Sequence, residues 1–251
     1  MESADVATEV VGGIRPVEEA IASGQREVFK LVVAKGRRGL GPLLRQAERQ
    51  RIPVEYSDRG HLDRLCPSAH QGVVALLAPY RYLELGELLA RASEGSGQAC
   101  LLALDGVVDP MNLGAVLRVA GAFGVGGVVV PRDRACGLTP AVARASAGAL
   151  EHVAIARVVN LVRALQELKK AGFWVVGTAA DASVAVDAFD WEGRAVVVVL
   201  GSEGKGMRAL VADTCDAVVS VPLPGPIGAL NVATVAAIVC YEIRRQKRPK
   251  G

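Results

Sequence analysis

The chain has 251 residues, of which 51% are hydrophobic and 4% aromatic, and its formal net charge is +3. That length fits one large domain or two small ones, and it can bury a core without disulfides or metal ions. The mildly basic balance permits a polyanionic partner without requiring one. No apolar run reaches the length of a membrane span, and the acidic N-terminal stretch does not resemble an export signal, so we expect neither membrane insertion nor export.

Cysteine and histidine usage indicates a reducing compartment and no metal centre. The cysteines are odd in number and widely spaced, and they never form a CxxC pair: Cys66, Cys100, Cys136, Cys215 and Cys240. This is typical of reduced, mostly buried thiols, so we expect a cytoplasmic protein. The histidines lack the spacing of metal ligands, so we expect no metal site: His61, His70 and His152.

The N-terminal third predicts a small domain that begins after a ragged tail. We expect disorder over residues 1–10 and a compact αβαβαβ unit over residues 11–79. The expected helices are "GGIRPVEEAIASG", which Gly24 closes, "LGPLLRQAERQ" and "SDRGHLDRLC". The expected strands are "EVFKLVVAK", "IPVEY" and "HQGVVALLAP". Residues 26–64 hold ten basic and five acidic side chains, which suits either RNA phosphate contacts or a solvated basic surface.

The remainder predicts a linker and then an α/β domain. Residues 80–98, which include "ASEGSGQ", have linker composition, and residues 99–251 alternate between strands and helices. The expected strands are "CLLALD", "GVVVPRD", "HVAIAR", "FWVVGTAA", "AVVVVLG" and "AVVSVPL". The expected helices are 113–123, 140–150, 161–171, 207–214 and 230–245. Nearly continuous apolar strands indicate a parallel sheet covered on both faces, in which ligands bind beyond the carboxyl ends of the strands.

The first loop at such an end is "LDGVVDPMNLGAVLRVAGAFG". Asp109 or Asn112 can cap the helix that follows, and Pro110 suits its first turn. Asn112 and Arg118 are six residues apart, which is about 240° around a helix. They can cooperate only if Asn112 lies in the entering turn or if a second chain takes part. The alternative is a cap and a solvated arginine.

Two further loops have the composition of ligand-binding turns. In "VVVVLGSEGKGM" a buried strand meets glycines that allow close approach to the backbone, and Glu203 can cap the next helix or hold a polar group. In "PLPGPIGALNVATVAAI" prolines stiffen a loop whose main-chain groups could recognise an adenine edge. Either loop could instead be a simple connector. Neither matches a P-loop or a dinucleotide fingerprint, which disfavours a nucleotide-binding oxidoreductase.

Taken together, "DPMNLGAVLRVAGAFG", "LGSEGKGM" and "VPLPGPIGALNVA" resemble the three motifs of the TrmH class of the SPOUT superfamily. Enzymes of that class methylate a ribose 2′-hydroxyl in RNA with S-adenosylmethionine. "GIRPVEEAI" and "HQGVVAL" resemble the substrate-binding domain of the RlmB family, the bacterial 23S rRNA guanosine 2′-O-methyltransferases. The resemblance spans nearly the whole chain. It implies a parallel-sheet α/β domain with a deep C-terminal trefoil knot, a small N-terminal α/β RNA-binding domain similar to a ribosomal protein, and an obligate homodimer with the active site at its interface.

The resemblance also implies roles for residues at matching positions. The cofactor would be held, largely by main chain, at Thr178, Ala179, Gly201, Val221 and Leu230. The site would be ordered by Asn112, Glu203 and Asn231, and Arg118 would meet the RNA phosphate or the target hydroxyl. Because the pKa of arginine exceeds about 12, we expect Arg118 to lower the pKa of the hydroxyl electrostatically rather than to act as the base.

Two departures from the family pattern bear on the function. Ala229 stands where most relatives have serine, so that position offers no hydroxyl, and Arg15 and Pro16 stand where relatives commonly have His-Ala. We expect the protein to methylate the ribose of a guanosine in 23S rRNA. The alternatives are the same chemistry on tRNA or on another rRNA nucleotide, or a non-catalytic RNA-binding or ribosome-assembly factor.

Overall fold

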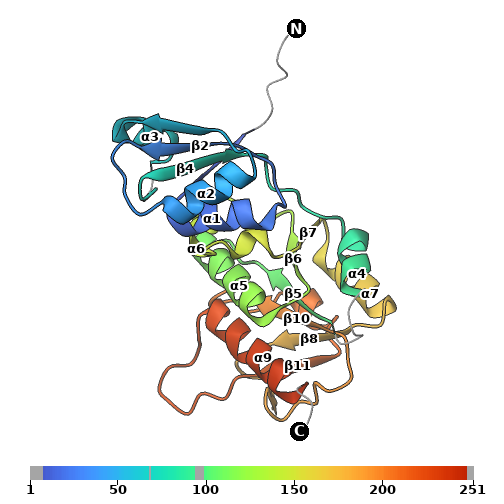
Figure 1. Ribbon diagram of the computed structural model, residues 1–251. Coiled ribbons are helices and arrows are strands. Elements are labelled where there is room, and N and C mark those ends of the chain that lie inside the picture. The colour runs from blue at the N-terminus through green and yellow to red at the C-terminus, as the bar shows by residue number, and fades with distance from the viewer. Residues whose placement is uncertain (1–7, 68, 94–98, 248–251) are drawn as a thin grey trace. The chain divides into compact units, whose positions relative to one another are not determined.

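The structure, a computed structural model, describes residues 8–67, 69–93 and 99–247 (Figure 1). The chain forms two compact units. The first holds the chain up to Arg81 together with Leu138–His152, and the second holds Tyr82–Gly137 together with the chain from Val153 onward. The expected division into contiguous domains at 11–79 and 99–251 is therefore wrong in one respect, because a segment from inside the second domain belongs to the first unit.

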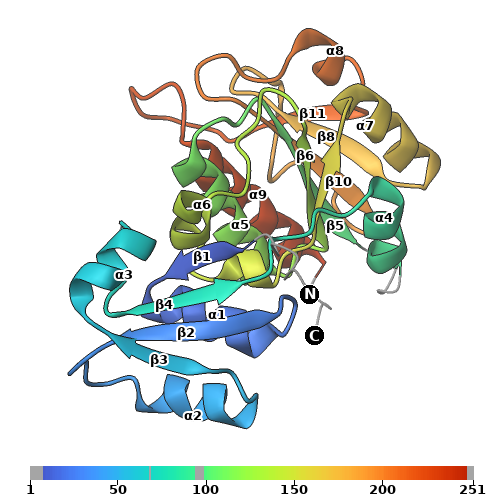
Figure 2. The same ribbon diagram turned by 90° about the horizontal axis from the view of Figure 1, so that it is seen from above.

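The first unit is built on a four-stranded sheet in the order β1-β4-β2-β3 (Figure 2). Its strands are β1 (Glu9–Gly12), β2 (Val28–Ala34), β3 (Val54–Ser57) and β4 (Val73–Leu77). Its first helices are α1 (Ile14–Ser23), α2 (Gly41–Arg49) and α3 (Arg59–Leu65). Leu62 of α3 packs against Val32 and Val74 on one face of the sheet, and α1 and α2 lie on the other. All six elements expected here are confirmed, including the left-handed cap of α1 at Gly24.

One strand of the first unit escaped the sequence prediction. Glu9 and Val10 belong to β1, where they pair with Leu77 and Leu76, so the expected tail over residues 1–10 is too long. Four residues give too short a pattern to be recognised without their neighbour β4. Residues 1–7 lie outside the described residues.

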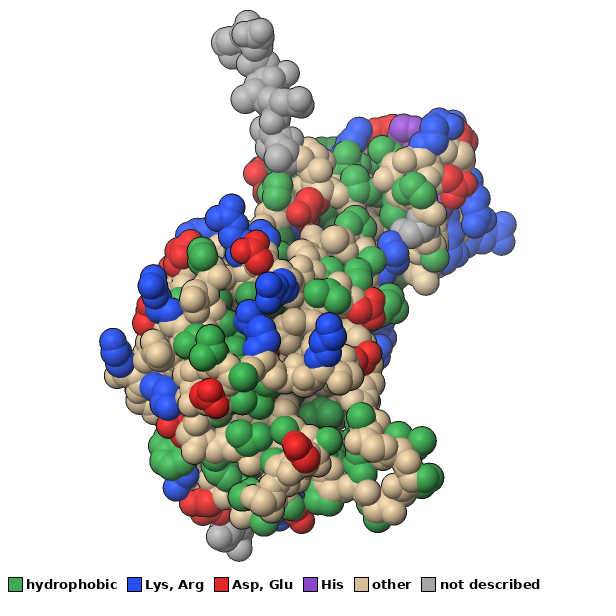
Figure 3. Space-filling view, turned by 180° about the vertical axis from the view of Figure 1, so that it is seen from behind, with side chains coloured by type: hydrophobic (Ala, Val, Ile, Leu, Met, Phe, Trp, Pro, Cys, Tyr) green, Lys and Arg blue, Asp and Glu red, His purple; other side chains and the backbone are tan. Residues whose placement is uncertain are grey.

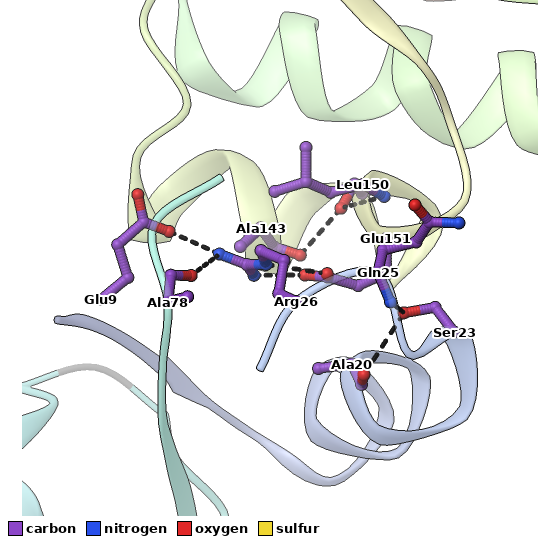
Figure 4. Close-up of polar contacts among 10 residues, drawn as sticks. Glu9, Ala20, Ser23, Gln25, Arg26, Ala78, Ala143, Leu150 and Glu151 are labelled. Carbon is purple, nitrogen blue, oxygen red and sulfur yellow. Dashed lines mark hydrogen bonds and ion pairs between the residues drawn. The ribbon is translucent and has the colours of Figure 1, made fainter. Parts of the chain in front are cut away.

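The inserted segment is tied into the first unit by a buried arginine (Figure 4). The Nε atom of Arg26 donates to Oε2 of Glu151 at 3.0 Å, and its terminal nitrogens bond Glu151, Glu9 and the carbonyl of Ala78. Arg26 is 7% exposed and Glu151 3%. Each charge has lost its water, so each depends on the other for compensation. The guanidinium thereby fastens Glu151 to β1 and to the end of β4.

The expected single helix over 140–150 is split within this segment. The structure has α6 (Pro140–Ala145), capped by the Thr139 hydroxyl, and a separate 3-10 turn, Ala149–Glu151. Ala147 and Gly148 lie between them with φ of 51° and 93°, which interrupts the helical hydrogen bonds.

We predict that Arg26→Ala destabilises the first unit by about 3 kcal/mol, because it leaves the Glu151 carboxylate buried without its partner. Lys30→Ala is the matched control, since Lys30 forms an ion pair with Glu55 in which the two side chains are 41% and 45% exposed. That change should cost less than about 1 kcal/mol. The loss of stability in each variant can be measured by hydrogen exchange of the backbone amides in β2 and β4. Equal protection in the two variants would contradict the importance assigned to the buried pair.

The second unit is a seven-stranded parallel sheet in the order β7-β6-β5-β10-β8-β11-β9. Its strands are β5 (Cys100–Asp105), β6 (Gly127–Pro131), β7 (Ile155–Val158), β8 (Trp174–Thr178), β9 (Val184–Ala185), β10 (Val196–Gly201) and β11 (Ala217–Ser220). Its helices are α4 (Leu85–Ser93), α5 (Pro110–Phe123), α7 (Leu161–Lys170), α8 (Ala209–Ala212) and α9 (Val232–Gln246). Helices α5 and α9 pack together on one face, and α4 and α7 cover the other (Figure 1).

The six expected strands of this unit are confirmed, and the parallel sheet with helices on both faces is confirmed with them. The expected linker over residues 80–98 is wrong where it is described, because α4 begins at Leu85 and buries Leu88 against the sheet. Residues 94–98 of that linker lie outside the described residues. Two helices start later than expected: α8 begins at Ala209, and α9 at Val232 because Asn231 caps it. The trefoil knot stays a prediction.

No cysteine forms a disulfide; Cys66 and Cys240 are buried, while the other three are half-buried. Among the described residues, no three His, Cys, Asp or Glu side chains lie together in a way that could hold a metal ion. The helices of the described ranges include none that is long and apolar enough to span a membrane.

Candidate functional site

A cavity of about 200 Å³ opens where β8, β10 and β11 end. These neighbouring strands are parallel and finish at Thr178, Gly201 and Ser220, so the residues that follow them meet at one edge of the sheet. The cavity is lined by all five residues predicted to hold a cofactor: Thr178, Ala179, Gly201, Val221 and Leu230. Most other lining residues are apolar, among them Leu200, Val219, Leu223, Val232 and Val235. The structure thus brings together the five predicted residues, although Thr178 and Leu230 are fifty-two positions apart in the sequence.

The floor of the cavity is a tight loop that needs glycine. The backbones of Ser202 and Gly206 exchange hydrogen bonds of 3.1 and 2.9 Å, which folds residues 202–206 back on themselves. A Cβ atom on Gly201 would lie 2.3 Å from the carbonyl carbon of Gly206 and 2.4 Å from the nitrogen of Met207. Any side chain at Gly201 would force these backbone segments apart.

A buried aspartate fixes the far end of the same loop. Asp105, the last residue of β5, is 1% exposed and pairs in register with Gly201. Its carboxylate accepts hydrogen bonds from the backbone N–H and the Nε atom of Arg208, at 2.8 and 2.7 Å. The sequence interpretation missed this residue, although an aspartate that ends the apolar run "CLLALD" was a visible signal. Asp105 holds residues 202–208 against the sheet.

Three of the four residues predicted to be catalytic form one hydrogen-bonded group. The side-chain nitrogen of Asn231 donates to Oδ1 of Asn112 at 2.8 Å and to Oε1 of Glu203 at 2.6 Å. Its side-chain oxygen accepts from the N–H of Ala233 and so caps α9. Asp109 caps α5, which places Asn112 in the first turn. Each of the three motif loops therefore contributes one side chain to this group.

Arg118 stands apart from this group within a single chain. It is exposed, six residues further along α5 than Asn112, and about 240° around the helix from it. Met111 lies seven residues before Arg118 and so projects from the same side of α5, and it is 60% exposed. The entering-turn position of Asn112 is confirmed, yet it does not bring Arg118 to the other three side chains.

The position without the family's serine is at the cavity wall. Ala229 lies in the proline-rich loop that precedes Asn231, is exposed, and lines the cavity with Leu223 and Leu230. The hydroxyl of Ser202, on the other side, donates to the carbonyl of Gly206 at 3.3 Å. The Ser202 hydroxyl therefore serves its own loop.

Residues 99–241, more than half of the chain, match the family model of the SpoU rRNA methylases. The chain belongs to this family. Residues 10–83 match the model described as RNA 2′-O ribose methyltransferase substrate binding. The two matches together account for most of both units.

Relatives and solved structures agree with this membership. The chain is 40% identical to a Staphylococcus aureus protein assigned to the TrmH family of tRNA/rRNA methyltransferases, over 96% of this chain and 98% of that one. A Bacillus subtilis protein assigned to the same family, YacO, is 41% identical to this chain, and the match covers 95% of this chain and 96% of that one. The crystal structure of the SpoU methyltransferase AviRb from Streptomyces viridochromogenes in complex with AdoMet has a TM-score of 0.79 and 26% identity, covering 95% of this chain and 90% of that one. A crystal structure of an RNA 2′-O ribose methyltransferase has a TM-score of 0.78 and 28% identity, and the match covers 96% of this chain and 89% of that one.

These similarities confirm the resemblance to TrmH-class enzymes and the α/β fold. The chain is thus an RNA 2′-O-ribose methyltransferase of the SpoU family. The role of each site residue stays a prediction, which the geometry above makes testable.

We predict that Gly201→Ala lowers methyl transfer to RNA by about a hundredfold or more, because displacing the 202–206 loop by about 1 Å misplaces the cavity wall. Gly86→Ala in α4 is the control: a Cβ there meets no atom within 4 Å. It should keep full activity, since alanine favours a helix over glycine. Incorporation of labelled methyl groups measures both variants. A fully active Gly201→Ala enzyme would disprove the steric argument.

Proposed function

We propose that this methylase transfers a methyl group from S-adenosylmethionine to the 2′-hydroxyl of a guanosine in 23S rRNA, in the cytoplasm and as a homodimer. The observation that carries the proposal is the Asn231 side chain, which links Asn112 and Glu203 beside the cavity. Three polar groups from three loops are thereby held in fixed positions at the cavity edge, as a positioning reaction requires.

The cavity suits an adenosine-bearing sulfonium. Its wall is largely apolar, and the bare backbone at Gly201 leaves room for close contact. Among the described residues that line it, Glu203 is the one with an ionisable side chain, and its negative charge favours a cation nearby. Thr178, Ala179, Val221 and Leu230 would enclose the ligand, and the Thr178 hydroxyl is already bonded to the carbonyl of Val199 at 3.0 Å. When bound, S-adenosylmethionine supplies a methyl group activated by its positive sulfur.

The protein's own task is to hold the ribose and favour loss of the hydroxyl proton. Asn112, Glu203 and Asn231 fix the loops between which the ribose would lie. The guanidinium of Arg118 is a positive charge that would stabilise the developing oxyanion and so lower the pKa of the 2′-hydroxyl.

A second subunit is needed to complete this arrangement. Arg118 projects from the same side of α5 as the exposed Met111, away from Asn112 of its own chain. Val108, just before this helix, is 62% exposed. Large apolar side chains so exposed beside an active site favour a covered surface. A homodimer that buries this side of α5 would offer Arg118 to the Asn112–Glu203–Asn231 group of the other protomer.

The exposed basic side chains of the first unit support the proposal that the substrate is RNA. Most of the basic side chains of residues 26–64 are exposed, among them Arg38, Arg45 and Arg51. Arg26 is buried, and its pairing with Glu151 keeps it from contacting RNA. Lys and Arg side chains are spread among acidic and apolar ones on the face seen in Figure 3. The resemblance of the first unit to RlmB-type substrate-binding domains favours 23S rRNA, and the relatives' naming as tRNA/rRNA methyltransferases keeps tRNA as the alternative.

The decisive experiment pairs calorimetric titration with S-adenosylmethionine and labelled methyl transfer onto purified 23S rRNA and tRNA. We expect cofactor binding and transfer to 23S rRNA that nuclease digestion traces to a 2′-O-methylguanosine. Transfer to tRNA alone would replace the proposed substrate. Cofactor binding without transfer to either RNA would favour the non-catalytic factor.

Mixed dimers test whether Arg118 acts across the interface. Arg118→Ala and Glu203→Ala homodimers should each be inactive, with the cofactor affinity of Arg118→Ala close to that of the parent. A hybrid of the two variants holds one site with both side chains intact, so it should recover about half of the parent activity. Inactive hybrids that still bind the cofactor and remain dimeric would contradict a role in trans.

Ala229→Ser tests the missing hydroxyl. Because Ala229 is exposed and the Asn112–Glu203–Asn231 group forms without it, we predict that kcat for RNA methylation changes by no more than about twofold. Steady-state kinetics at saturating cofactor measures this. A large gain in kcat would instead assign the lost serine a part in the chemistry.

A further inference from the structure

A second concave surface lies on the catalytic unit, outside the cofactor cavity. This groove, with a volume of about 660 Å³, surrounds the ends of β6 and β7 and the start of α7. The side chains that matter here are Tyr82, Arg132, Arg157, Asn160, Arg163 and Glu167. None of these residues belongs to the three motif loops.

Three arginines from three segments meet in the groove. Arg132 follows β6, Arg157 lies in β7, and Arg163 is in the first turn of α7, and all three are exposed. None forms an ion pair with an acidic side chain of the described chain. Glu84 and Glu167 also line the groove, so three positive charges face two negative ones. Guanidinium groups without carboxylate partners are available to bind an anion.

The side chain of Arg157 is positioned by contacts with two neighbouring residues. The guanidinium carbon of Arg157 lies 5.0 Å from the centre of the Tyr82 ring, and a terminal nitrogen donates to the carbonyl of Arg132 at 3.3 Å. The N–H of Arg132 in turn donates to the carbonyl of Val158 at 2.7 Å, which fastens the end of β6 to β7. Arg157 is exposed and hydrogen-bonded to the protein through one terminal nitrogen, so its ring contact orders the side chain while other N–H groups stay available, and an ordered arginine loses little entropy when it binds phosphate.

The groove shares the sheet edge of the cofactor cavity. Strands β7, β6, β5 and β10 are consecutive and parallel, so Val158 and Gly201 end on the same side. Three interstrand spacings separate β7 from β10, about 15 Å in all. A polynucleotide that reaches the cofactor cavity can therefore cross the groove within a few nucleotides.

We propose that Arg132, Arg157 and Arg163 bind phosphates of the substrate RNA, a few nucleotides from the ribose that is methylated. The inference rests on the proposed function and extends it: the catalytic unit grips the RNA backbone itself, in addition to the substrate-binding unit. An open groove with charges contributed by three segments fits a chain of phosphates better than a single small anion.

The test uses the full-length dimer with Arg132→Gln and Arg163→Gln combined, which leaves the Arg157–Tyr82 stack in place. Lys170→Gln is the matched control, since Lys170 is exposed at the other end of α7 and does not line the groove. Circular dichroism verifies folding. Binding of poly(U) RNA is measured over a range of salt concentrations, together with KM for 23S rRNA and calorimetric affinity for S-adenosylmethionine.

We expect the double variant to bind poly(U) at least about tenfold more weakly, because two charge-assisted contacts are lost. The slope of log K against log salt should become shallower by about 1.4, or 0.7 for each lost phosphate contact. KM for 23S rRNA should rise while cofactor affinity stays that of the parent, and Lys170→Gln should match the parent in all these properties.

The possible failures are distinguishable. A parent enzyme that binds no S-adenosylmethionine and methylates no RNA would refute the proposed function. An active parent whose double variant keeps its poly(U) affinity and salt slope would overturn the groove proposal alone. Inorganic phosphate binding that the double variant abolishes, with poly(U) affinity unchanged, would likewise overturn it and identify a small-anion site.

Discussion

The site depends on one amide group. The Asn231 side chain accepts a hydrogen bond that starts α9 and donates two more, to Asn112 and Glu203, which lie 119 and 28 residues away in the sequence. A single planar group therefore sets the relative positions of three loops. Aspartate at this position would lose both donors, and serine would reach only one of the acceptors. The motif needs asparagine because asparagine combines an acceptor for capping with two N–H donors.

The loops can meet at Asn231 because the sheet beneath them leaves little freedom. Parallel strands end at one edge, and the ends of β5, β8 and β10 are anchored there: Asp105 holds Arg208, Thr178 bonds the carbonyl of Val199, and Gly201 permits backbone contact that any other residue would forbid. The apolar core below includes Val197 and Val199, which project from one face of β10 and fix that face against the core. A largely apolar cavity is thereby pre-formed, so ligand binding requires little ordering.

Much of this was predictable from the sequence, and the failures have physical causes. Short, β-branched runs such as "AVVVVLG" indicate buried strands, and the composition of the three loops pointed to the correct edge of the sheet. The strand at Glu9–Gly12 and the helix at Leu85–Ser93 were missed because partners distant in the sequence stabilise them. Spacing alone correctly showed that Arg118 and Asn112 point apart, but no property of one chain says what Arg118 faces. Asp105 was overlooked because its partner, Arg208, is 103 residues away.

The placement of Leu138–His152 in the first unit constrains how the two halves of this chain can be separated, in evolution or at the bench. A fragment cut after Arg81 would keep Arg26 but lose Glu151, and so would carry a guanidinium in an apolar interior with only Glu9 and a carbonyl to bond. The complementary fragment would contain α6 and the turn with Glu151, but it would lack the four-stranded sheet of the first unit against which α6 packs at β1. The ranges recognised by sequence similarity, 10–83 and 99–241, consequently do not coincide with the two compact units, and an exchange of substrate-binding modules between family members would have to include Leu138–His152.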